Sequence, residues 1–419
     1  MPAGLADLAG QELDLLQLDY RRARAVPASE NGSIEFPGYA AGIAQAARTL
    51  VKPLFLDPDL RIITSAGWGD AFGCVEQIAS IFIEGGCGDL PLAAVRGSNL
   101  LPILEMLEAD GVPLTNAETG AAWRDLKEPL LAADLQLGGG PIAMALAESA
   151  RVIVAGCYDD AAPAAALAVR EYGWSWRDFD SLASAAVAAR AAAWRHWDVD
   201  RDAPASLPWT PGWVELDEDG RSTVNGAAAG ESAPAALERW LKDERNAKND
   251  LVAADVRVRL PAITCKATAL RQISISGAAG APHDGSWRLE ILYQAGFSAE
   301  AMVEFSAEAD RELVESLTQA AHAYLSHASD PSGLMTVEPL RPLNSVGPSW
   351  LHLAYQSKSR KACQFFADQV VRLFSAHEFH ARLAAGTLRV QAHCGVWPVR
   401  VPRDAVDIAV ETRAAKEWV

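Results

Sequence analysis

Short apolar runs alternate with longer segments of helical spacing between residues 50 and 193. The apolar runs predict strands at residues 61–65, 92–96 and 151–155. Helical spacing follows at residues 73–83 and 100–107, and an alanine-rich helix is predicted from Ser181 to Trp197. This alternation is typical of βα units that build a mostly parallel sheet. We therefore expect an α/β domain over residues 1–250, with a Rossmann-like sheet flanked by helices.

The pattern changes after residue 251, where apolar and polar positions alternate with period two. A strand is predicted at residues 287–293, and a returning strand at residues 302–305 across a loop at Gly296. Helices are predicted at residues 308–327 and 361–374, and closing strands at residues 387–391 and 405–411. We expect residues 251–419 to form a smaller α+β lobe with a mixed or antiparallel sheet.

Two further segments connect these halves. Residues 198–212 carry four prolines and a charge cluster, which predicts a linker or an exposed excursion. Residues 213–224 predict a hairpin around the turn from Asp217 to Gly220, and residues 234–249 a polar helix.

Each strand of the first half runs into a glycine followed by small or polar residues. These glycines are Gly67, Gly97 and Gly156. Open parallel sheets bind ligands at the carboxyl ends of their strands. We therefore expect the three turns to share one crevice that holds a ligand.

Composition narrows the possible partners. With 37 basic and 54 acidic residues the net charge is −17, which argues against nucleic acid and anionic membranes as partners. Met1 to Gly10 contains Asp7 and no basic region before an apolar stretch, so a cytoplasmic protein without a secretory signal is expected. No apolar run approaches the roughly 20 residues that span a bilayer.

Neither a metal nor a cofactor is predicted. The six cysteines are scattered without a CxxC pair, which favours reduced thiols. His377 and His380 form an isolated HxxH pattern without the third ligand that metal sites usually need. Neither a GxGxxG motif nor a P-loop lysine is present, which argues against a nucleotide cofactor bound in the usual ways.

Several motifs stand in an order that points to one family. They are Leu13 to Tyr20, Ser65-Ala-Gly-Trp-Gly-Asp-Ala-Phe-Gly-Cys74, Leu137-Gly-Gly-Gly-Pro-Ile142, Arg151-Val-Ile-Val-Ala-Gly156 with Asp160, Glu171-Tyr-Gly-Trp174 and Asp178-Phe-Asp-Ser-Leu-Ala183. This order resembles the acyclic terpene utilisation (AtuA-type) family from about residue 13 to residue 185. The resemblance implies a role in the breakdown of branched or isoprenoid acids as acyl-CoA thioesters.

The chain departs from the family pattern at several polar positions. Ser65 and Asp70 stand where the family has asparagine, Trp68 where it has glycine, and Cys157 where it has arginine. Ser98-Asn99 replaces an acidic pair, and the alanine-rich Ala185 to Trp194 replaces a polar run. A later glycine-rich segment is represented only by residues 225–230. Relative to the family, the opening glycine loop and the ferredoxin-like extension that follows the main domain are expected to be absent.

Two carboxylates are the candidate catalytic residues. Asp160 ends a strand in a family-matched turn, where it could act as general base or as the N-cap of the next helix. Asp70 follows Gly67 and Gly69 and could serve as the second carboxylate or as a cap.

The candidate substrate-binding residues are Ser65, Gly67, Trp68, Gly97, Gly138, Gly139 and Cys157. The loop from Gly138 to Pro141 could cradle a phosphate or carboxylate at the start of a helix, or be a tight turn. Cys157 is a nucleophile only if a cation or helix N-terminus stabilises its thiolate, and is otherwise a small buried residue. Trp68 could form an aromatic wall for an apolar acyl or terpenoid chain, or lie in the core.

Three hypotheses follow for the function. The first is an enzyme that transfers a proton next to a carbonyl of an acyl or terpenoid substrate, as a lyase, hydratase or isomerase does. The second is a catalytically silent subunit that assembles with an active paralogue or partner, and the third a natural-product biosynthetic enzyme with repurposed loops. A homo-oligomer or an assembly with a paralogue is expected.

Overall fold

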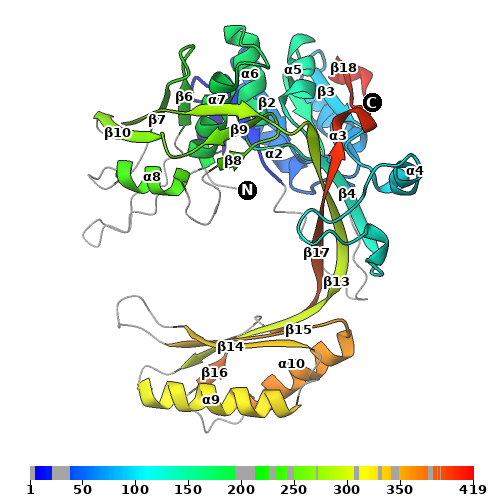
Figure 1. Cartoon of the computed structure of the whole chain (residues 1–419), viewed down its shortest axis with the longest axis vertical. Coiled ribbons are helices and arrows are strands. Elements are labelled where there is room, and N and C mark those ends of the chain that lie inside the picture. Colours follow the sequence, from blue (N-terminus) through cyan, green and yellow to red (C-terminus); the bar gives the residue numbers. More distant parts are fainter. Residues whose placement is uncertain are drawn as a thin grey trace.

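The computed structural model has an upper α/β body and a lower lobe, joined by a long two-stranded ribbon (Figure 1). It describes residues 5–20, 38–193, 213–225, 233–242, 250–269, 272–305, 311–328, 333–340, 349–375, 381–384, 386 and 388–419. The predicted linker at residues 198–212 and the pair His377 and His380 lie outside these ranges. None of the helices in the described ranges is both long and apolar enough to span a bilayer.

The upper body is built on a sheet with the strand order β1-β2-β5-β3-β18. Four strands run parallel and the edge strand β18 runs antiparallel to β3. The strands are β1 (Leu15–Leu18), β2 (Arg61–Thr64), β5 (Val152–Val154), β3 (Pro91–Arg96) and β18 (Ala409–Ala414). The strands predicted near residues 61, 92 and 151 are thus confirmed, and the sheet is rich in parallel pairs as expected.

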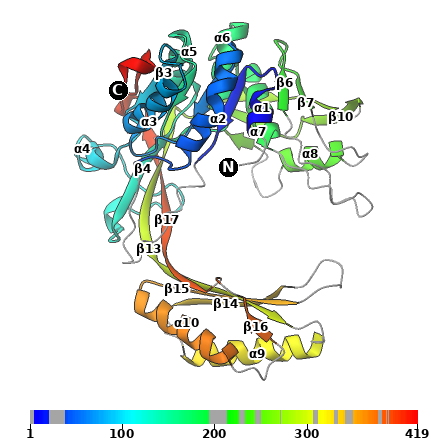
Figure 2. The same cartoon turned by 180° about the vertical axis from the view of Figure 1, so that it is seen from behind.

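Successive residues of each strand face opposite layers, because side chains alternate across a strand. Ile62 packs in the core beneath α2 and α3, which lie in front of the sheet in Figure 2. Ile63 packs in the opposite core with α4, α5 and α6. The helices of the upper body are α1 (Leu5–Ala9), α2 (Ile43–Leu56), α3 (Ala71–Glu84), α4 (Leu104–Ala109), α5 (Gly139–Ala147), α6 (Ala162–Tyr172) and α7 (Phe179–Ala193). Short 3-10 turns span Leu101–Ile103, Trp123–Asp125, Arg403–Ala405 and Ala415–Glu417.

Two small antiparallel sheets flank α7. One has the order β10-β11-β7-β6 and the other β12-β9-β8. Their strands are β6 (Trp213–Leu216), β7 (Ser222–Asn225), β8 (Asp250–Val252), β9 (Val256–Arg259), β10 (Thr264–Ala269), β11 (Gln272–Ser276) and β12 (Ala279–Pro282), and α8 (Ala233–Lys242) packs beside them. The predicted hairpin is confirmed, since β6 and β7 pair across a turn in which the Gly220 nitrogen donates to the Asp217 carbonyl at 3.0 Å.

The ribbon consists of β13 (Ser286–Phe305) and β17 (Arg389–Pro402), which pair from Ser286 and Pro402 to Glu300 and Arg389. The prediction of two strands separated by a loop at Gly296 is wrong, because β13 continues through this position. Gly296 marks a bulge at which the register shifts, its φ is +152°, and an added Cβ would lie 2.5 Å from the Ser357 carbonyl oxygen. The glycine therefore permits a bend and a close approach rather than a chain reversal.

The lower lobe follows the element order βαββαβ. From β13 the chain passes through α9 (Arg311–Ala328), β14 (Leu334–Leu340), β15 (Trp350–Ser357), α10 (Arg360–Ser375) and β16 (Ala381–Leu383) into β17. The sheet order β14-β15-β13-β16 is that of a ferredoxin-like unit. Both helices lie on the face turned away from the upper body (Figure 1). A ferredoxin-like extension was expected to be absent, but the structure contains a unit of this element order, inserted between β13 and β17.

The described residues do not divide in space at residue 250. The upper half of β13 pairs with β4 (Leu130–Gln136), and β18 pairs with β3, so both return to the upper body. Leu289 and Val399 are fully buried in the same core as Ile153. The long strands belong to both parts, a feature that local periodicity does not reveal.

Candidate functional site

The turns after β2, β3 and β5 meet at the carboxyl edge of the parallel sheet. The Gly67 nitrogen donates to the Ala155 carbonyl at 3.1 Å, and the Asn99 side chain donates to the Gly69 carbonyl at 3.3 Å. A Cβ added at Gly156 would lie 2.9 Å from the Ser98 hydroxyl. The three glycine turns therefore lie together, as the strand order requires.

Much of this edge is covered by the chain itself. The nitrogens of Gly69 and Asp70 both donate to the Gly38 carbonyl at 2.7 Å. On the other side β4 crosses the edge, where the Leu135 nitrogen donates to the Ser98 carbonyl at 2.8 Å and the Leu137 nitrogen to Cys157 at 3.1 Å. Trp68 is 3% exposed and Cys157 1% exposed. Both side chains lie in the interior.

Ser65 and Gly97 have clear structural contacts. The buried Ser65 hydroxyl accepts from the Tyr20 nitrogen at 2.8 Å and donates to Asp19 Oδ1 at 3.1 Å. Gly97 has a φ of +89°, and a Cβ there would lie 2.2 Å from the Asp407 carbonyl oxygen. A packing requirement therefore accounts for glycine at this position.

The two predicted catalytic carboxylates are both exposed. Asp70 is the N-cap of α3, where Oδ1 accepts from the Gly73 nitrogen at 2.8 Å. At the start of α6 it is Asp159, the neighbour of Asp160, that accepts from the Ala161 nitrogen at 2.9 Å. Asp70 and Asp159 therefore stabilise the starts of two different helices, α3 and α6.

The Gly138 loop faces a carboxylate of the protein. The Gly139 nitrogen, at the N-terminus of α5, donates to Asp255 Oδ2 at 2.6 Å. A Cβ at Gly138 would lie 2.2 Å from Asp255 Oδ1. The carboxylate at this helix start therefore belongs to the protein itself, from the segment between β8 and β9, and the predicted binding of a substrate carboxylate or phosphate by this loop stays a prediction.

A cavity of about 160 Å³ lies beside this contact, next to the turn after β5. Its walls come from segments far apart in the sequence: Gln136, Asp159, Val252, Ala253, Ala254, His283, Ser286, Arg288 and Arg400. A cavity of about 150 Å³ admits a benzene ring, so this one admits a group of roughly six heavy atoms. The remainder of a larger ligand must extend to solvent.

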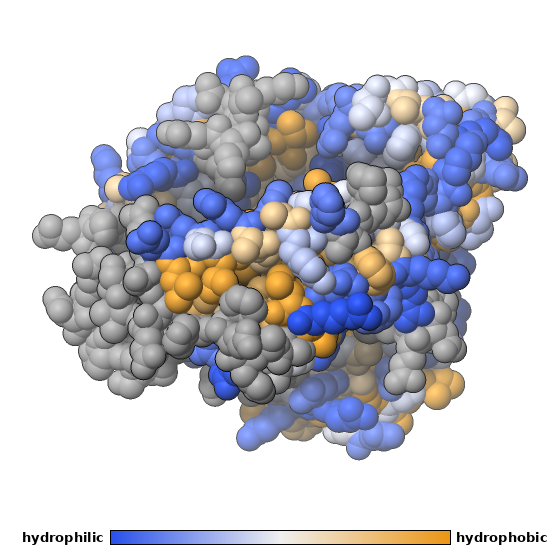
Figure 3. Space-filling model, turned by 90° about the horizontal axis from the view of Figure 1, so that it is seen from below, coloured by the Kyte–Doolittle hydropathy of each residue, from blue (hydrophilic) through white to orange (hydrophobic). Residues whose placement is uncertain are grey.

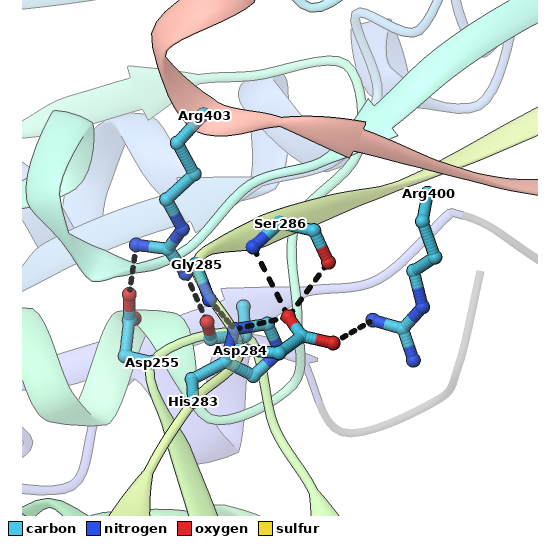
Figure 4. A network of polar contacts seen from close by, with 8 residues as sticks. Asp255, His283, Asp284, Gly285, Ser286, Arg400 and Arg403 are labelled. Carbon is cyan, nitrogen blue, oxygen red and sulfur yellow. Dashed lines mark hydrogen bonds and ion pairs between the residues drawn. The ribbon is translucent and has the colours of Figure 1, made fainter. Parts of the chain in front are cut away.

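His283 is a titratable residue of the cavity wall, and its side chain is 7% exposed. Its Nδ1 accepts a hydrogen bond from the Gly285 nitrogen at 3.3 Å and lies 3.1 Å from Asp284 Oδ1 (Figure 4). Burial lowers the pKa of His283. The negative charge of Asp284 raises this pKa, and the positive charges of Arg403 and Arg400 lower it further, so that the net shift is downward. The imidazole is therefore neutral near pH 7, and with Nδ1 accepting from Gly285 its hydrogen lies on Nε2.

Asp284 remains a carboxylate. Burial alone raises its pKa, but hydrogen bonds from the Ser286 hydroxyl at 2.7 Å and the Ser286 nitrogen at 3.0 Å outweigh burial and lower it. Arg400 approaches its other oxygen at 3.9 Å from the opposite side (Figure 4). At this distance the guanidinium is held only loosely by Asp284.

The cavity walls carry two arginines beside the carboxylate of Asp159, within a chain of net charge −17. Arg400 and Arg288 line it, and Arg288 Nε lies 3.2 Å from Glu290. Guanidinium groups at a partly enclosed cavity suit a carboxylate or a developing oxyanion. Together with a neutral histidine, the arrangement can hold an anionic group and move a proton beside it.

These residues were missed by the sequence interpretation, which selected glycine turns. The local signal was the run from Pro282 to Gly285, which places a histidine and an aspartate in a turn. Within the described ranges, no cluster of three or more His, Cys, Asp or Glu residues is suited to a metal ion.

A larger depression of about 740 Å³ lies at the opposite edge, beside residues 9–14 and 57–59. It adjoins the amino ends of β1 and β2, whereas parallel sheets bind ligands at the carboxyl ends. Its position argues for the smaller cavity as the candidate site.

Comparison with known proteins gives one match. The family model described as "Acyclic terpene utilisation family protein AtuA" matches residues 4–192 and 203–412. No curated protein and no solved structure matches the chain.

Proposed function

Because the chain belongs to the acyclic terpene utilisation (AtuA) family, we propose that it is an enzyme of branched or isoprenoid acyl metabolism. Its substrate is of the acyl-CoA type, and its chemistry is proton transfer at a carbon next to a carbonyl. A lyase, hydratase or isomerase performs such a step. Family membership supports the metabolic setting, and the cavity beside β5 supports the chemistry.

The observation that carries the proposal is a neutral, buried His283 facing the same cavity as Arg288 and Arg400. Because Nδ1 accepts from the Gly285 nitrogen, the neutral ring carries its hydrogen on Nε2 and can donate it to the carbonyl oxygen of the substrate as a general acid. The arginines then stabilise the negative charge that develops on the carbonyl oxygen. The cavity volume of about 160 Å³ suits the reacting end of the acyl group, with its remainder outside.

Asp159 contributes a carboxylate to the cavity wall, while its other role is to cap the turn before α6. A catalytic role of Asp160 stays a prediction. Its side chain is exposed, and the cavity lining includes its neighbour Asp159 instead. Asp70 is assigned here to the N-terminus of α3.

The proposal is tested by exchange of the α-proton of branched acyl thioesters in deuterated water, followed by mass spectrometry. General acid and base groups contribute about 100-fold or more, so His283→Gln should lower the exchange rate by at least that factor. The matched control is His352→Gln, a half-buried histidine on β15 in the lower lobe. Wild-type exchange that survives His283→Gln unchanged would remove the assignment of His283.

A second candidate is a catalytically silent subunit that assembles with an active paralogue. It is favoured by the changed family positions Ser65, Trp68 and Cys157, and by exposed apolar surface on the lower lobe. Leu334 on β14 is 68% exposed. Figure 3 shows a separate apolar area on the underside of the molecule.

A purified chain that exchanges protons by itself would rule this second candidate out. The homo-oligomer that the sequence predicts is tested by light scattering on a sizing column, which measures the mass of the purified protein in solution. Leu334→Glu should reduce the oligomer if β14 takes part, whereas Leu56→Glu on α2, where the leucine is 66% exposed, is the matched control. A third candidate, a natural-product biosynthetic enzyme with repurposed loops, is separated from the first by the genes that neighbour this one.

A further inference from the structure

We infer that Arg403 and Asp255 form a clamp that positions His283 in the cavity. Neither residue lines the cavity wall, so both act through the groups they hold. The inference rests on the proposed function only in taking His283 as the working group of the site.

Arg403 begins the 3-10 turn that follows β17, and it contacts two separate segments beside the cavity. Its nitrogen donates to the Gly285 carbonyl at 3.2 Å, which fixes the turn that carries His283. Its guanidinium contacts Asp255 Oδ1 at 3.3 Å and donates to the Ala254 carbonyl, in the segment between β8 and β9 (Figure 4). Through its backbone nitrogen and its side chain, Arg403 thus joins two segments that each lie more than 100 residues from it in the sequence.

The guanidinium is itself held in place. Its central carbon lies 4.0 Å from the centroid of the Trp287 ring, in cation–π contact at the start of β13. Asp255 is held from its other side by the Gly139 nitrogen at 2.6 Å. The side chains of Asp255 and Arg403 are 12% and 33% exposed, so the pair is partly shielded from solvent. The clamp therefore fixes α5, the β8–β9 segment and the His283 turn relative to one another.

The two charges of the clamp act on His283 in opposite directions. Arg403 lowers the pKa of His283 and Asp255 raises it, after the larger effects of burial and Asp284. The other charged groups facing this site are Arg400, which also lowers it, and the cavity residues Asp159 and Arg288. Removing the charge of Arg403 and removing that of Asp255 should therefore shift the pKa of His283 in opposite directions. Loss of a contact that only stabilises the fold would shift it in the same direction in both variants.

The experiment follows the titration of His283 by NMR in the full chain, with histidines selectively labelled and His283 assigned through His283→Gln. Arg403→Met removes the positive charge and should raise the midpoint. Asp255→Asn removes the negative charge, while its side-chain oxygen can still accept from the Gly139 nitrogen, and should lower the midpoint. Arg403→Lys keeps the charge and should restore the midpoint toward that of the wild type.

The matched control is Arg413→Met, because Arg413 makes a similar contact with an indole, 5.1 Å from the Trp418 centroid. It should leave the His283 midpoint unchanged. If the residues only stabilised the fold, both clamp variants would expose His283 and move its midpoint upward together, toward the ordinary value of 6.5. A shift in the same direction for both variants, or none, overturns the inference.

The outcome is independent of the acyl substrate. Opposite shifts without any proton exchange on acyl thioesters would refute the proposed chemistry and leave the clamp in place. Exchange that depends on His283, together with an unmoved midpoint in both variants, would do the reverse.

Discussion

Replacing Gly97 with alanine tests whether this glycine serves packing. Its φ of +89° costs a non-glycine residue about 1–2 kcal/mol. The added Cβ would also lie 2.2 Å from the Asp407 oxygen and 3.3 Å from the Ile408 Cα, both backbone atoms just before β18. Relieving such overpacking costs about 1–3 kcal/mol. We expect Gly97→Ala to lower the free energy of unfolding by about 2–5 kcal/mol, a large part of the 5–15 kcal/mol typical of a domain.

The control is Gly86→Ala, whose φ of +79° is similar but whose Cβ would meet no atom within 4 Å. It should cost only the backbone part, about 1–2 kcal/mol. Urea unfolding at equilibrium, followed by tryptophan fluorescence, measures both variants by linear extrapolation. Equal losses for the two variants would show that the contact with Asp407 does not constrain position 97, and would return Gly97 to the list of ligand-contacting residues.

Three further outcomes are expected. Asp70→Ala should cost about 0.5–2 kcal/mol, because α3 loses its N-cap, and Asp70→Asn should cost less, as urea unfolding can measure. Burial lowers the pKa of His283 in the folded protein below the ordinary value of 6.5. The neutral imidazole therefore favours the folded state above pH 6.5, and this stabilisation is lost as the pH falls through the pKa of the folded protein. His283→Gln should flatten the acid side of a plot of melting temperature against pH. Burial, reinforced by Asp70, raises the pKa of Cys74 to about 12, so iodoacetamide at pH 8 should label Cys74 only in urea, and labelling in the folded protein would contradict its burial.

Local patterns predicted the elements of the upper body well. Strands at residues 61, 92 and 151 are recognisable because each is a short, buried apolar run between helical segments. Their parallel order then required the turns at Gly67, Gly97 and Gly156 to meet at one edge. The convergence of these turns was therefore available from the sequence.

The character of the site was not available from the sequence. Gly296 lies in an alternating apolar stretch, and a bulge and a reversing loop call for the same local residues. The cavity is built from Gln136, His283 and Arg400, which are brought together by pairings over hundreds of residues. The spacing of apolar residues along the chain carries no information about such long-range contacts. The glycine turn at Gly138, which Asp255 occupies, also has the same sequence pattern as a turn that is open to a ligand.

The two strands of the ribbon leave the upper body side by side, with Gln294 opposite Cys394 and Tyr293 opposite Gly395. The chain therefore enters and exits the lower lobe at adjacent points. Linking residue 294 to residue 394 through a two-residue turn would make an ordinary β-hairpin of the remaining ribbon and keep the pairing of β4 with β13. The lower lobe is therefore an insertion that gene rearrangement can exchange, lengthen or remove, while the residues that line the cavity in the upper body stay in place.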